Sequence, residues 1–407
     1  MAGPLSHIRV LDLSRVLAGP WASQNLADLG AEVIKVERPG TGDDSRAFGP
    51  PWVKDRAGHD TKDSAYFTSA NRGKKSITLN IAAPEGQAIA RELALASDVL
   101  IENYKYGDLA RYGLAYDQLK GPNPRLVYCS VTGFGQTGPY RERPGYDFMI
   151  QGMGGMMSVT GEPDDAPGGG PQRAGVPIAD IITGMYASIA ICAALAHRER
   201  TGKGQSLDLA LLDSQIALLA YQNTNYFATG KPPRRIGNLH PNIVPYQPFR
   251  AADGEVILAC GNDNLYRKFC EAAGCAELAR DARFATNGKR VENRVELTRL
   301  LGEVFRKRSK REWLELLEAT GVPNGPINDV AQVFEEPQVK ARGVRIELEH
   351  AAAGKLPLVA SPMRFSETPI EYRRAPPVLG EHTNEVLRGV LAKSDAEIAR
   401  LRAAGVI

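Results

Sequence analysis

The sequence predicts an α/β protein in which a doubly wound, Rossmann-like parallel sheet forms a large domain and a smaller α+β domain accompanies it. Two observations support this prediction. Short apolar segments alternate with helix-like segments through the first 131 residues, and this alternation is typical of strand–helix–strand units. The 407 residues, 43% of them hydrophobic and 24% charged, are enough to form two cores of ordinary globular composition.

Strands are expected where short apolar runs occur, and helices where longer stretches separate them. The expected strands are residues 8–13, 31–37, 76–79, 98–102 and 126–131. The expected helices between them are residues 21–29 and 84–96. Because helices carry the chain back across the sheet between strands, neighbouring strands are predicted to be parallel.

Two segments rich in proline, glycine and charged residues, 46–63 and 161–171, are predicted to be loops. The glycine-rich loop 161–171 is either a linker or a lid over a site, since long loops near sites are often functional. A long helical region is expected from residue 182 to about residue 228. Its apolar part, residues 185–196, is too short to span a bilayer, so a buried helix and no membrane role are expected.

The loop-like segment 230–248 predicts a boundary between two domains. The large domain is expected to span residues 1–228 and to be completed by residues 332–407, and the smaller domain to span residues 229–331. Within the smaller domain we expect a strand at residues 256–259 and helices at residues 265–273, 291–307 and 310–319. The C-terminal segment is expected to end in a helix near residues 395–404.

The composition excludes several classes of protein. The formal net charge of +3 is small for this length and argues against a general nucleic-acid surface. The N-terminus MAGPLSHIRVLDLS lacks the basic and apolar regions of a secretory signal, and the five cysteines are expected to be reduced and mostly buried. We therefore expect a cytoplasmic protein without a metal, since neither the cysteines nor the histidines form a recognisable metal motif.

The first strand–helix–strand unit ends in Glu37, and an acid there can hold a ribose hydroxyl of a dinucleotide. The loop between strand and helix, residues 14–20, contains one glycine where the dinucleotide fingerprint requires three. A nicotinamide or flavin site is therefore not expected. The sequence also lacks the G-x-S-x-G, H-E-x-x-H and G-x-x-x-x-G-K-[ST] motifs of common hydrolases, zinc proteases and phosphate-binding loops.

Asp180 is the strongest catalytic candidate, because this carboxylate precedes an apolar helix rich in small residues. In GVPIADIITGMYA, Asp180 lies where an N-cap aspartate would lie, and the structural interpretation is that it caps the first backbone amides. The functional interpretation is a partly shielded carboxylate that attacks a thioester as a nucleophile. The local pattern alone leaves both interpretations open.

Eight segments occur in order over almost the whole chain. They are LDLSRVLAGPWASQNLADLGAEVIKVERP, NRGKKSITLN, DVLIENYKYGDLARYGL, NPRLVYCSVTGFGQTGPYRERPGYD, VPIADIITGMYA, HRERTGKGQSLDLALLDS, GVPNGPINDVAQVFEEPQV and PPVLGEHTNEVL. This series resembles the class III CoA-transferases, the family of formyl-CoA transferase and carnitine CoA-transferase-like enzymes. The resemblance implies that Asp180 is the acyl carrier: its carboxylate attacks the donor acyl-CoA to give a mixed anhydride, which CoA thiolate converts to an aspartyl-CoA thioester.

The same resemblance implies that coenzyme A is a substrate and that no cofactor is bound permanently. By the family's pattern the CoA-binding residues are Arg15, Val16, Leu17, Ala18, Arg38, Arg72, Lys75, Asn103, Tyr104 and Arg111. Several cations are expected because CoA carries a 3′-phosphate and a pyrophosphate. Family members form two interlocked rings, so the resemblance also implies an obligate homodimer with long linkers at residues 232–248 and 323–337.

The resemblance is strongest to members that use dicarboxylic acids, among them the succinyl-CoA:glutarate transferases. It implies a succinyl-CoA donor and a short dicarboxylate acceptor such as glutarate, and a substrate pocket that includes Tyr146, His240 and Gly261. Tyr146 stands where related acyl-CoA racemases carry a histidine, which acts there as the second acid/base in the exchange of an α-proton. The reference pKa of tyrosine is too high for it to replace histidine easily in this role. The alternatives are a 2-methylacyl-CoA racemase and a catalytically silent CoA-binding protein.

Overall fold

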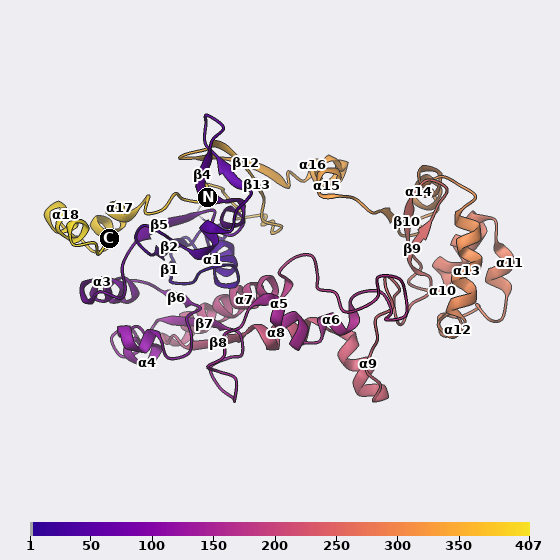
Figure 1. The fold of residues 1–407 in the computed structure, drawn as a ribbon, viewed down its shortest axis with the longest axis horizontal. Helices are drawn as coiled ribbons and strands as arrows, with labels where there is room; N and C mark the ends of the chain where they lie inside the picture. The colour runs from indigo at the N-terminus through magenta and orange to yellow at the C-terminus, as the bar shows by residue number, and fades with distance from the viewer. Residues whose placement is uncertain (1–2) are drawn as a thin grey trace. The chain divides into compact units, whose positions relative to one another are not determined.

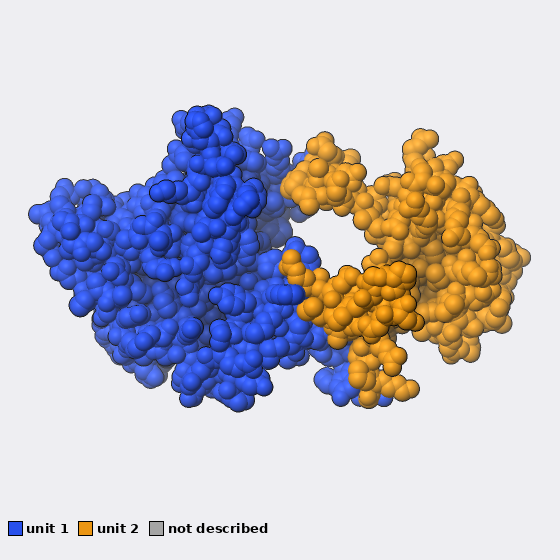
Figure 2. Space-filling model, viewed as in Figure 1, with its two compact units in different colours: residues 1–156, 174–229, 338–407 blue, residues 157–173, 230–337 orange. Residues whose placement is uncertain are grey.

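The computed structural model describes residues 3–407, which form two compact units shown in different colours in Figure 2. Unit 1 contains the described residues up to Met156, then Ala174–Thr229 and Gln338–Ile407. Unit 2 contains Met157–Arg173 and Gly230–Pro337. The glycine-rich loop 161–171 is therefore part of unit 2.

Unit 1 is built on a sheet of six parallel strands in the order β5–β2–β1–β6–β7–β8 (Figure 1). The strands are β1 (Arg9–Asp12), β2 (Glu32–Glu37), β5 (Lys74–Thr78), β6 (Val99–Glu102), β7 (Val127–Thr132) and β8 (Ser206–Ala210). Val10 of β1 lies opposite Val33 of β2 on one side and opposite Val99 of β6 on the other. The predicted parallel sheet is confirmed, and five of its six strands lie at the expected apolar runs.

Buried side chains on both faces of the sheet explain why its strands read as nearly continuous apolar runs. Val10 belongs to a core that contains residues of α1 (Ala18–Asp28) and α7 (Ile178–Thr201). The next residue, Leu11, belongs to a second core that contains residues of α3 (Pro84–Leu95) and of the C-terminal helices. Helices therefore pack on each face of the sheet.

The strand order places β1 and β6 side by side at the middle of the sheet. From β1 the chain proceeds outward through β2 and β5, and then returns to β6 and proceeds in the other direction through β7 and β8. This is the order 3-2-1-4-5-6 of doubly wound sheets, in which the loops after the two central strands diverge and leave a crevice at the carboxyl ends of the strands. A ligand site is therefore expected beside the ends of β1 and β6.

Two of the elements predicted for unit 1 are wrong. Residues 206–210, expected within a helical region, form β8 at the edge of the sheet, and their partial exposure removes the apolar run that marked the inner strands. The expected loop 46–63 contains a hairpin of β3 (Trp52–Lys54) and β4 (Asp60–Ser64). The sequence of β4, DTKDS, is polar and charged, and such residues have little preference for strands.

The predicted helical region consists of α7 followed, beyond β8, by α8 (Leu211–Leu218) and α9 (Tyr221–Thr229). The expectation of a buried helix is wrong for one face of α7, where Met185, Tyr186 and Ile189 are exposed. With 24 residues α7 is also longer than its apolar run, and by length and composition it is the one helix among residues 3–407 that could cross a membrane. Its other face packs in the core of unit 1.

Unit 2 contains a three-stranded antiparallel sheet with the order β11–β10–β9. Its elements are β9 (Tyr246–Arg250), β10 (Glu255–Ala259), α10 (Asp263–Ala273), α11 (Ala276–Arg280), α12 (Asn287–Glu292), α13 (Arg294–Phe305), α14 (Lys310–Ala319) and β11 (Asn324–Pro326). The ring of Phe305 stacks on Phe249 at 4.7 Å and on Trp313 at 4.4 Å between centroids. The strand predicted at 256–259 and the helix at 310–319 are confirmed, whereas the helix expected at 291–307 is interrupted at Asn293.

The remaining elements are short. They are η1 (Asp44–Ala47), α2 (Ala65–Thr68), η2 (Leu109–Tyr112), α4 (Tyr116–Leu119), α5 (Asp147–Met153), α6 (Met156–Val159), α15 (Val330–Glu335), α16 (Pro337–Ala341), β12 (Arg345–His350), β13 (Gly354–Val359), α17 (Thr383–Gly389) and α18 (Asp395–Ala403). Strands β12 and β13 pair as an antiparallel hairpin. The helix predicted near the C-terminus is confirmed as α18.

Candidate active site

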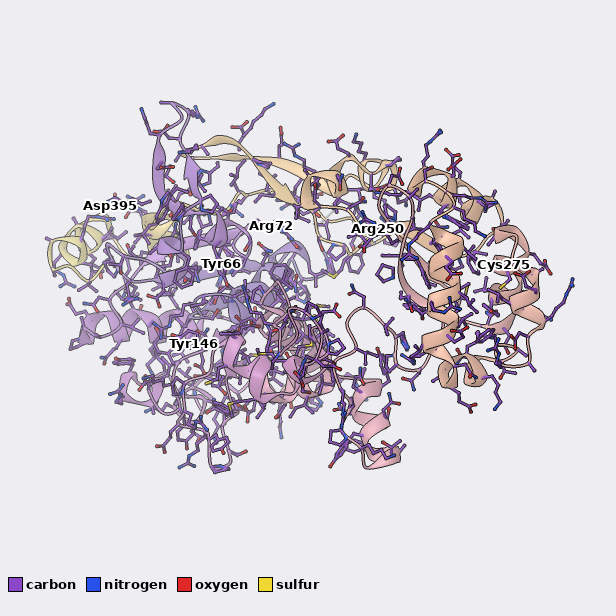
Figure 3. All side chains as sticks on the ribbon, turned by 45° about the vertical axis from the view of Figure 1, so that its right-hand side comes forward. Tyr66, Arg72, Tyr146, Arg250, Cys275 and Asp395 are labelled. Carbon is purple, nitrogen blue, oxygen red and sulfur yellow. The ribbon has the colours of Figure 1, made fainter. Side chains whose placement is uncertain are left out.

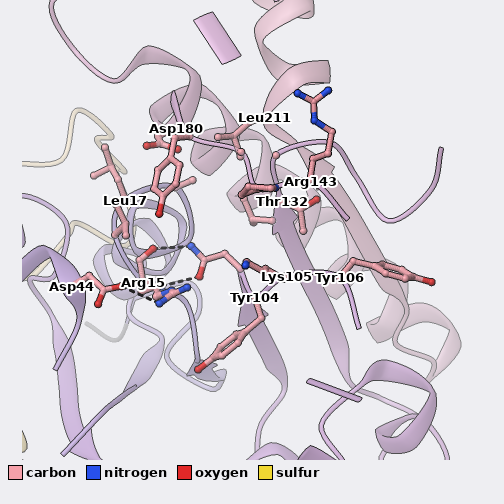
Figure 4. Close-up of a pocket in the computed structure, with 18 of the residues that line it drawn as sticks. Arg15, Leu17, Asp44, Tyr104, Lys105, Tyr106, Thr132, Arg143, Asp180 and Leu211 are labelled. Atoms are coloured by element: carbon pink, nitrogen blue, oxygen red, sulfur yellow. Dashed lines mark hydrogen bonds and ion pairs between the residues drawn. The ribbon is translucent and has the colours of Figure 1, made fainter. Parts of the chain in front are cut away.

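A pocket in unit 1 opens at the carboxyl ends of β1, β6 and β7 (Figure 4). It is lined by residues of the loop after β1, η1, the loop after β6, the end of β7, the turn before α5, the first turn of α7 and the start of α8. These residues are Arg15, Val16, Leu17, Ala18, Asp44, Asn103, Tyr104, Lys105, Tyr106, Val131, Thr132, Gly133, Arg141, Arg143, Pro144, Gly145, Tyr146, Asp180 and Leu211. The pocket thus occupies the crevice that the strand order predicts.

Asp180 is the third residue of α7, so the interpretation of this residue as an N-cap is wrong. The N-cap position belongs to Pro177, whose side chain cannot accept a hydrogen bond. The capping oxygen comes instead from Asp147, whose Oδ1 accepts the N–H of Ala179 at 2.8 Å and that of Asp180 at 3.3 Å. The carboxylate of Asp180 is therefore not needed to satisfy the helix.

The environment of Asp180 disfavours its negative charge. Among residues 3–407 no side chain or backbone group forms a hydrogen bond or ion pair with its carboxylate, which is only partly exposed and lines the pocket. Burial, and secondarily the Asp147 carboxylate, raise the pKa of Asp180 to about 7. A desolvated, unpaired carboxylate of this kind is a stronger nucleophile than one solvated by water.

Asp147 is held firmly in its capping position. Two glycine backbones meet just before it: a Cβ added to Gly133 would lie 2.5 Å from the Cα of Gly145, so neither position has room for a side chain. This contact fixes the turn before α5 against the end of β7. Within α5, Gln151 Nε2 donates to Asp147 Oδ2 at 2.6 Å, and Gln151 Oε1 accepts the N–H of Ala174 at 2.9 Å.

The loop after β1 presents its backbone to the pocket. Asn103 clamps Arg15, because Asn103 Oδ1 accepts the Arg15 N–H at 2.9 Å and Asn103 Nδ2 donates to the Arg15 carbonyl at 2.7 Å. Val16 has a φ of 68°, a conformation that costs a β-branched residue about 1–3 kcal/mol. Among the described residues nothing accepts the N–H groups of Leu17 and Ala18 at the start of α1. These amides are available to a ligand.

Four residues that line the pocket carry positive charge, and Arg38 lines a neighbouring pocket that shares Arg15 and Tyr104 with it. Figure 4 shows Arg15 beside Asp44, with Nη1 of Arg15 2.9 Å from Oδ2 of Asp44, and Arg38 pairs with the other oxygen of the same carboxylate. Lys105, Arg141 and Arg143 also line the pocket, and the sequence analysis did not single them out. The signal that could have identified two of them is the run Arg141-Glu142-Arg143 next to Tyr146, which was already a candidate.

Four predicted CoA ligands do not line this pocket: Arg38 lines the neighbouring one, and the other three lie elsewhere. Arg72, labelled in Figure 3, is buried, and its Nε donates to Asp28 Oδ1 at 2.9 Å. Lys75 forms ion pairs with Glu32 at 2.6 Å and with Glu385 at 2.9 Å. Arg111 is exposed and pairs with Asp108, three residues earlier. Their charges are thus partly neutralised within the chain.

Two predicted substrate residues belong to unit 2. The Nδ1 atom of His240 accepts the N–H groups of Asn242 at 3.0 Å and Ile243 at 3.1 Å, and burial and Arg294 lower the pKa of His240. Gly261 follows β10, and among residues 3–407 no heavy atom outside its chain neighbours lies within 4 Å of the position a Cβ would take there. The third, Tyr146, is 69% exposed and lines the pocket of unit 1. Over residues 3–407 no group of His, Cys, Asp and Glu could hold a metal ion.

Comparisons with known proteins agree over almost the whole chain. Residues 5–383 match the family described as CoA-transferase family III. A succinate–glutarate CoA-transferase of Agrobacterium fabrum is 51% identical over 94% of this chain and 95% of its own, and the human succinyl-CoA:glutarate CoA-transferase is 44% identical over 99% of this chain and 90% of its own. A solved structure of a CAIB/BAIF family protein from Brucella suis has a TM-score of 0.82 and 50% identity, and the match covers 96% of this chain and 100% of the other.

Proposed function

The chain belongs to CoA-transferase family III, and from this premise we propose that it transfers coenzyme A from succinyl-CoA to glutarate, with Asp180 as the acyl carrier. It is a CoA-transferase. The proposed substrates rest on two relatives, one named for succinate and glutarate and the other for succinyl-CoA and glutarate. They are 51% and 44% identical to this chain, each over at least 94% of its length. The pocket around Asp180 supports the proposed nucleophile.

In the proposed first half-reaction the Asp180 carboxylate attacks the carbonyl carbon of the donor thioester. The C–S bond breaks, CoA leaves as a thiolate, and a mixed anhydride of Asp180 and succinate remains. The thiolate then attacks the aspartyl carbonyl of the anhydride, so succinate leaves and an aspartyl-CoA thioester forms. The raised pKa of Asp180 suits it to the first step, in which its carboxylate is the nucleophile, since a weakly solvated carboxylate attacks readily.

In the second half-reaction the steps run in reverse with the acceptor. The glutarate carboxylate attacks the aspartyl-CoA thioester, CoA thiolate leaves, and a mixed anhydride of Asp180 and glutarate forms. The thiolate attacks the glutaryl carbonyl, which gives glutaryl-CoA and restores the Asp180 carboxylate. The free N–H groups at the start of α1 favour negative charge on the groups that react in this pocket.

We assign the CoA contacts to the predicted ligands that lie in or beside the pocket. These are Arg15, Val16, Leu17, Ala18, Arg38, Asn103 and Tyr104, to which Lys105 and Arg141 are added. The phosphates of CoA are expected to pair with the cations. The backbone amides are expected to donate hydrogen bonds to the uncharged arm of CoA, which joins its phosphates to its thiol. Arg72, Lys75 and Arg111 are left out, because each already pairs with a carboxylate away from the pocket.

Asp44 is expected to compete with the phosphates of CoA for Arg15 and Arg38. An exposed ion pair is worth little, so a doubly charged phosphate should displace the carboxylate at a small cost. Replacing Asp44 by asparagine should therefore tighten CoA binding by about threefold at low salt. Isothermal titration calorimetry with CoA measures this change, and Asp117→Asn, which breaks the exposed pair with Lys120, is the matched control. Weaker binding by the Asp44 variant would contradict the assignment.

The substrates are tested by assaying succinyl-, acetyl- and formyl-CoA as donors against a set of dicarboxylates. The proposal requires glutaryl-CoA to form fastest from succinyl-CoA and glutarate. An acyl adduct on Asp180 that hydroxylamine removes would exclude a silent CoA-binding protein. Deuterium exchange at the α-carbon of a 2-methylacyl-CoA at a rate that rivals acyl transfer would favour a racemase instead, with Tyr146 in the place of the second acid/base.

We also propose that the enzyme is an obligate homodimer, as family membership implies. Large apolar side chains are exposed in this single chain, among them Ile189 on α7 at 63% and Phe227 on α9 at 76%. Faces of this kind usually mark interfaces. Light scattering should give the mass of two chains at every concentration at which the protein is active, and an active folded monomer on dilution would contradict the proposal.

A further inference from the structure

The backbone of Val16 is held in a conformation that its side chain disfavours. Only three residues other than glycine have a positive φ in the described chain, and Val16 is the only one of them that lines the pocket. The peptide that joins Val16 to Leu17 turns with the backbone angles of Val16, so these angles set the direction of the Leu17 N–H. A strained residue beside a binding site persists only where its surroundings hold it.

Asp43 is the group that holds Val16. Its two carboxylate oxygens accept the Val16 N–H at 3.0 and 3.3 Å. Asp43 is fixed in turn by Ser45, whose N–H and hydroxyl donate to Oδ1 at 2.9 and 2.8 Å, and by Glu37, which accepts the Asp43 N–H at 2.9 Å. The carboxylate therefore has a defined position before any ligand binds.

Lys35 joins the same network from the neighbouring strand. Its Nζ lies 2.8 Å from Asp43 Oδ2 and also donates to the Ser14 carbonyl at 2.8 Å, and both side chains of the ion pair are fully buried. Burial opposes ionisation of Asp43, but the Lys35 ammonium lowers the pKa of Asp43 to about 2. One buried pair thus holds the loop after β1 at two points on either side of Arg15, the Ser14 carbonyl and the Val16 amide.

We propose that Asp43, fixed by Lys35, is a positioning residue that keeps Val16 in the left-handed conformation and so directs the free N–H groups of Leu17 and Ala18 toward the bound acyl-CoA. The inference rests on the proposed function, because it takes this pocket to be the CoA site. Asp43 lines the neighbouring pocket that contains Arg38, does not line the pocket of Asp180 and is not expected to touch the reacting atoms. Its effect on binding is transmitted through the backbone of Val16.

The test compares the binding of CoA by Asp43→Asn and by the double variant Asp43→Asn/Val16→Gly in the full-length protein. Loss of the charge should let Val16 leave the left-handed region and weaken CoA binding by about tenfold. Glycine adopts a positive φ without strain, so the double variant should recover about threefold of that loss although it lacks the same ion pair. Recovery of affinity by a second substitution distinguishes positioning from general destabilisation.

Asp63→Asn is the matched control, because Asp63 forms a comparable buried pair with Arg46 at 2.6 Å and does not contact the loop. It should lower the melting temperature and leave CoA affinity unchanged. Wild-type affinity in Asp43→Asn, or no recovery in the double variant, would overturn the inference. If Asp43→Asn does not fold, the double variant is compared with Val16→Gly, and affinities within about threefold of each other support the inference whereas a larger gap overturns it. Failure of the wild type to bind CoA would refute the proposed site itself.

Discussion

Replacing Asp180 by alanine is expected to lower the rate of CoA transfer by roughly 10⁴-fold or more, because the variant has no group that can carry the acyl chain. Binding of CoA should change by less than about threefold, since the cations and backbone amides of the pocket remain in place. Asp180→Asn, which keeps the shape of the side chain, should be equally inactive. Steady-state assays measure the rate of transfer, and isothermal titration calorimetry measures the binding of CoA. Mass spectrometry of the protein after incubation with succinyl-CoA shows whether an acyl adduct forms.

Asp213→Ala supplies the matched control for Asp180→Ala. Asp213 is the third residue of α8, as Asp180 is of α7, but it is exposed and does not line the pocket. Its loss should cost only the interaction of one carboxylate with a helix start, about 0.3–1 kcal/mol of stability. Normal turnover by the Asp180 variant, or an acyl adduct on another residue, would refute the assignment of the nucleophile.

The second prediction concerns pH. Because burial and the Asp147 carboxylate raise the pKa of Asp180 to about 7, this group is largely protonated in the free enzyme at pH 6, and a protonated carboxyl does not attack a thioester. The value of kcat/KM for succinyl-CoA should therefore approach a tenfold fall for each pH unit below the pKa, or roughly 50-fold between pH 7 and pH 5. A profile of kcat/KM against pH, measured at low substrate concentration, shows this fall as its acidic limb.

Two variants assign the acidic limb to Asp180. Asp147→Asn removes the neighbouring negative charge while its amide oxygen can still cap α7, so the limb should move to lower pH. Glu102 is a second buried carboxyl near the site, and burial raises its pKa to about 7 as well. Glu102→Gln should leave the limb in place. If the acidic limb disappeared in Glu102→Gln and stayed at the same pH in Asp147→Asn, the titrating group would be Glu102, and the assignment to Asp180 would be wrong.

The fold was predictable from sequence where a local pattern reflects burial on both sides of the sheet. The inner strands β1, β2, β6 and β7 are short runs in which apolar residues predominate, although β2 also carries the buried Lys35 and Glu37, so their positions follow largely from the hydrophobic effect. The edge strand β8 is partly exposed and therefore lacks that pattern. The hairpin of β3 and β4 depends on pairing between polar segments, which no local propensity encodes.

The site was predictable only in part, because several roles depend on contacts between distant residues. The N-cap role expected of Asp180 passes to Asp147, which lies 33 residues earlier in the sequence. The basic residues Arg15 and Arg72 are alike in sequence terms, but only Arg15 lines the pocket, while Asp28 holds Arg72 elsewhere. The left-handed Val16 carries no sequence signal at all, since the residue type argues against that conformation.

The contact between the Gly133 and Gly145 backbones limits how this enzyme could be redirected to other acids. A methyl group on either glycine would overlap the backbone of the other glycine. The resulting displacement would pass to Asp147 and from there to the start of α7. A mutant library aimed at new acceptors should therefore keep both glycines and the proposed CoA contact Lys105, and randomise Tyr106 and Arg143, which line the same pocket. Such a library would vary the walls of the pocket without displacing Asp147 or the start of α7, which carries Asp180.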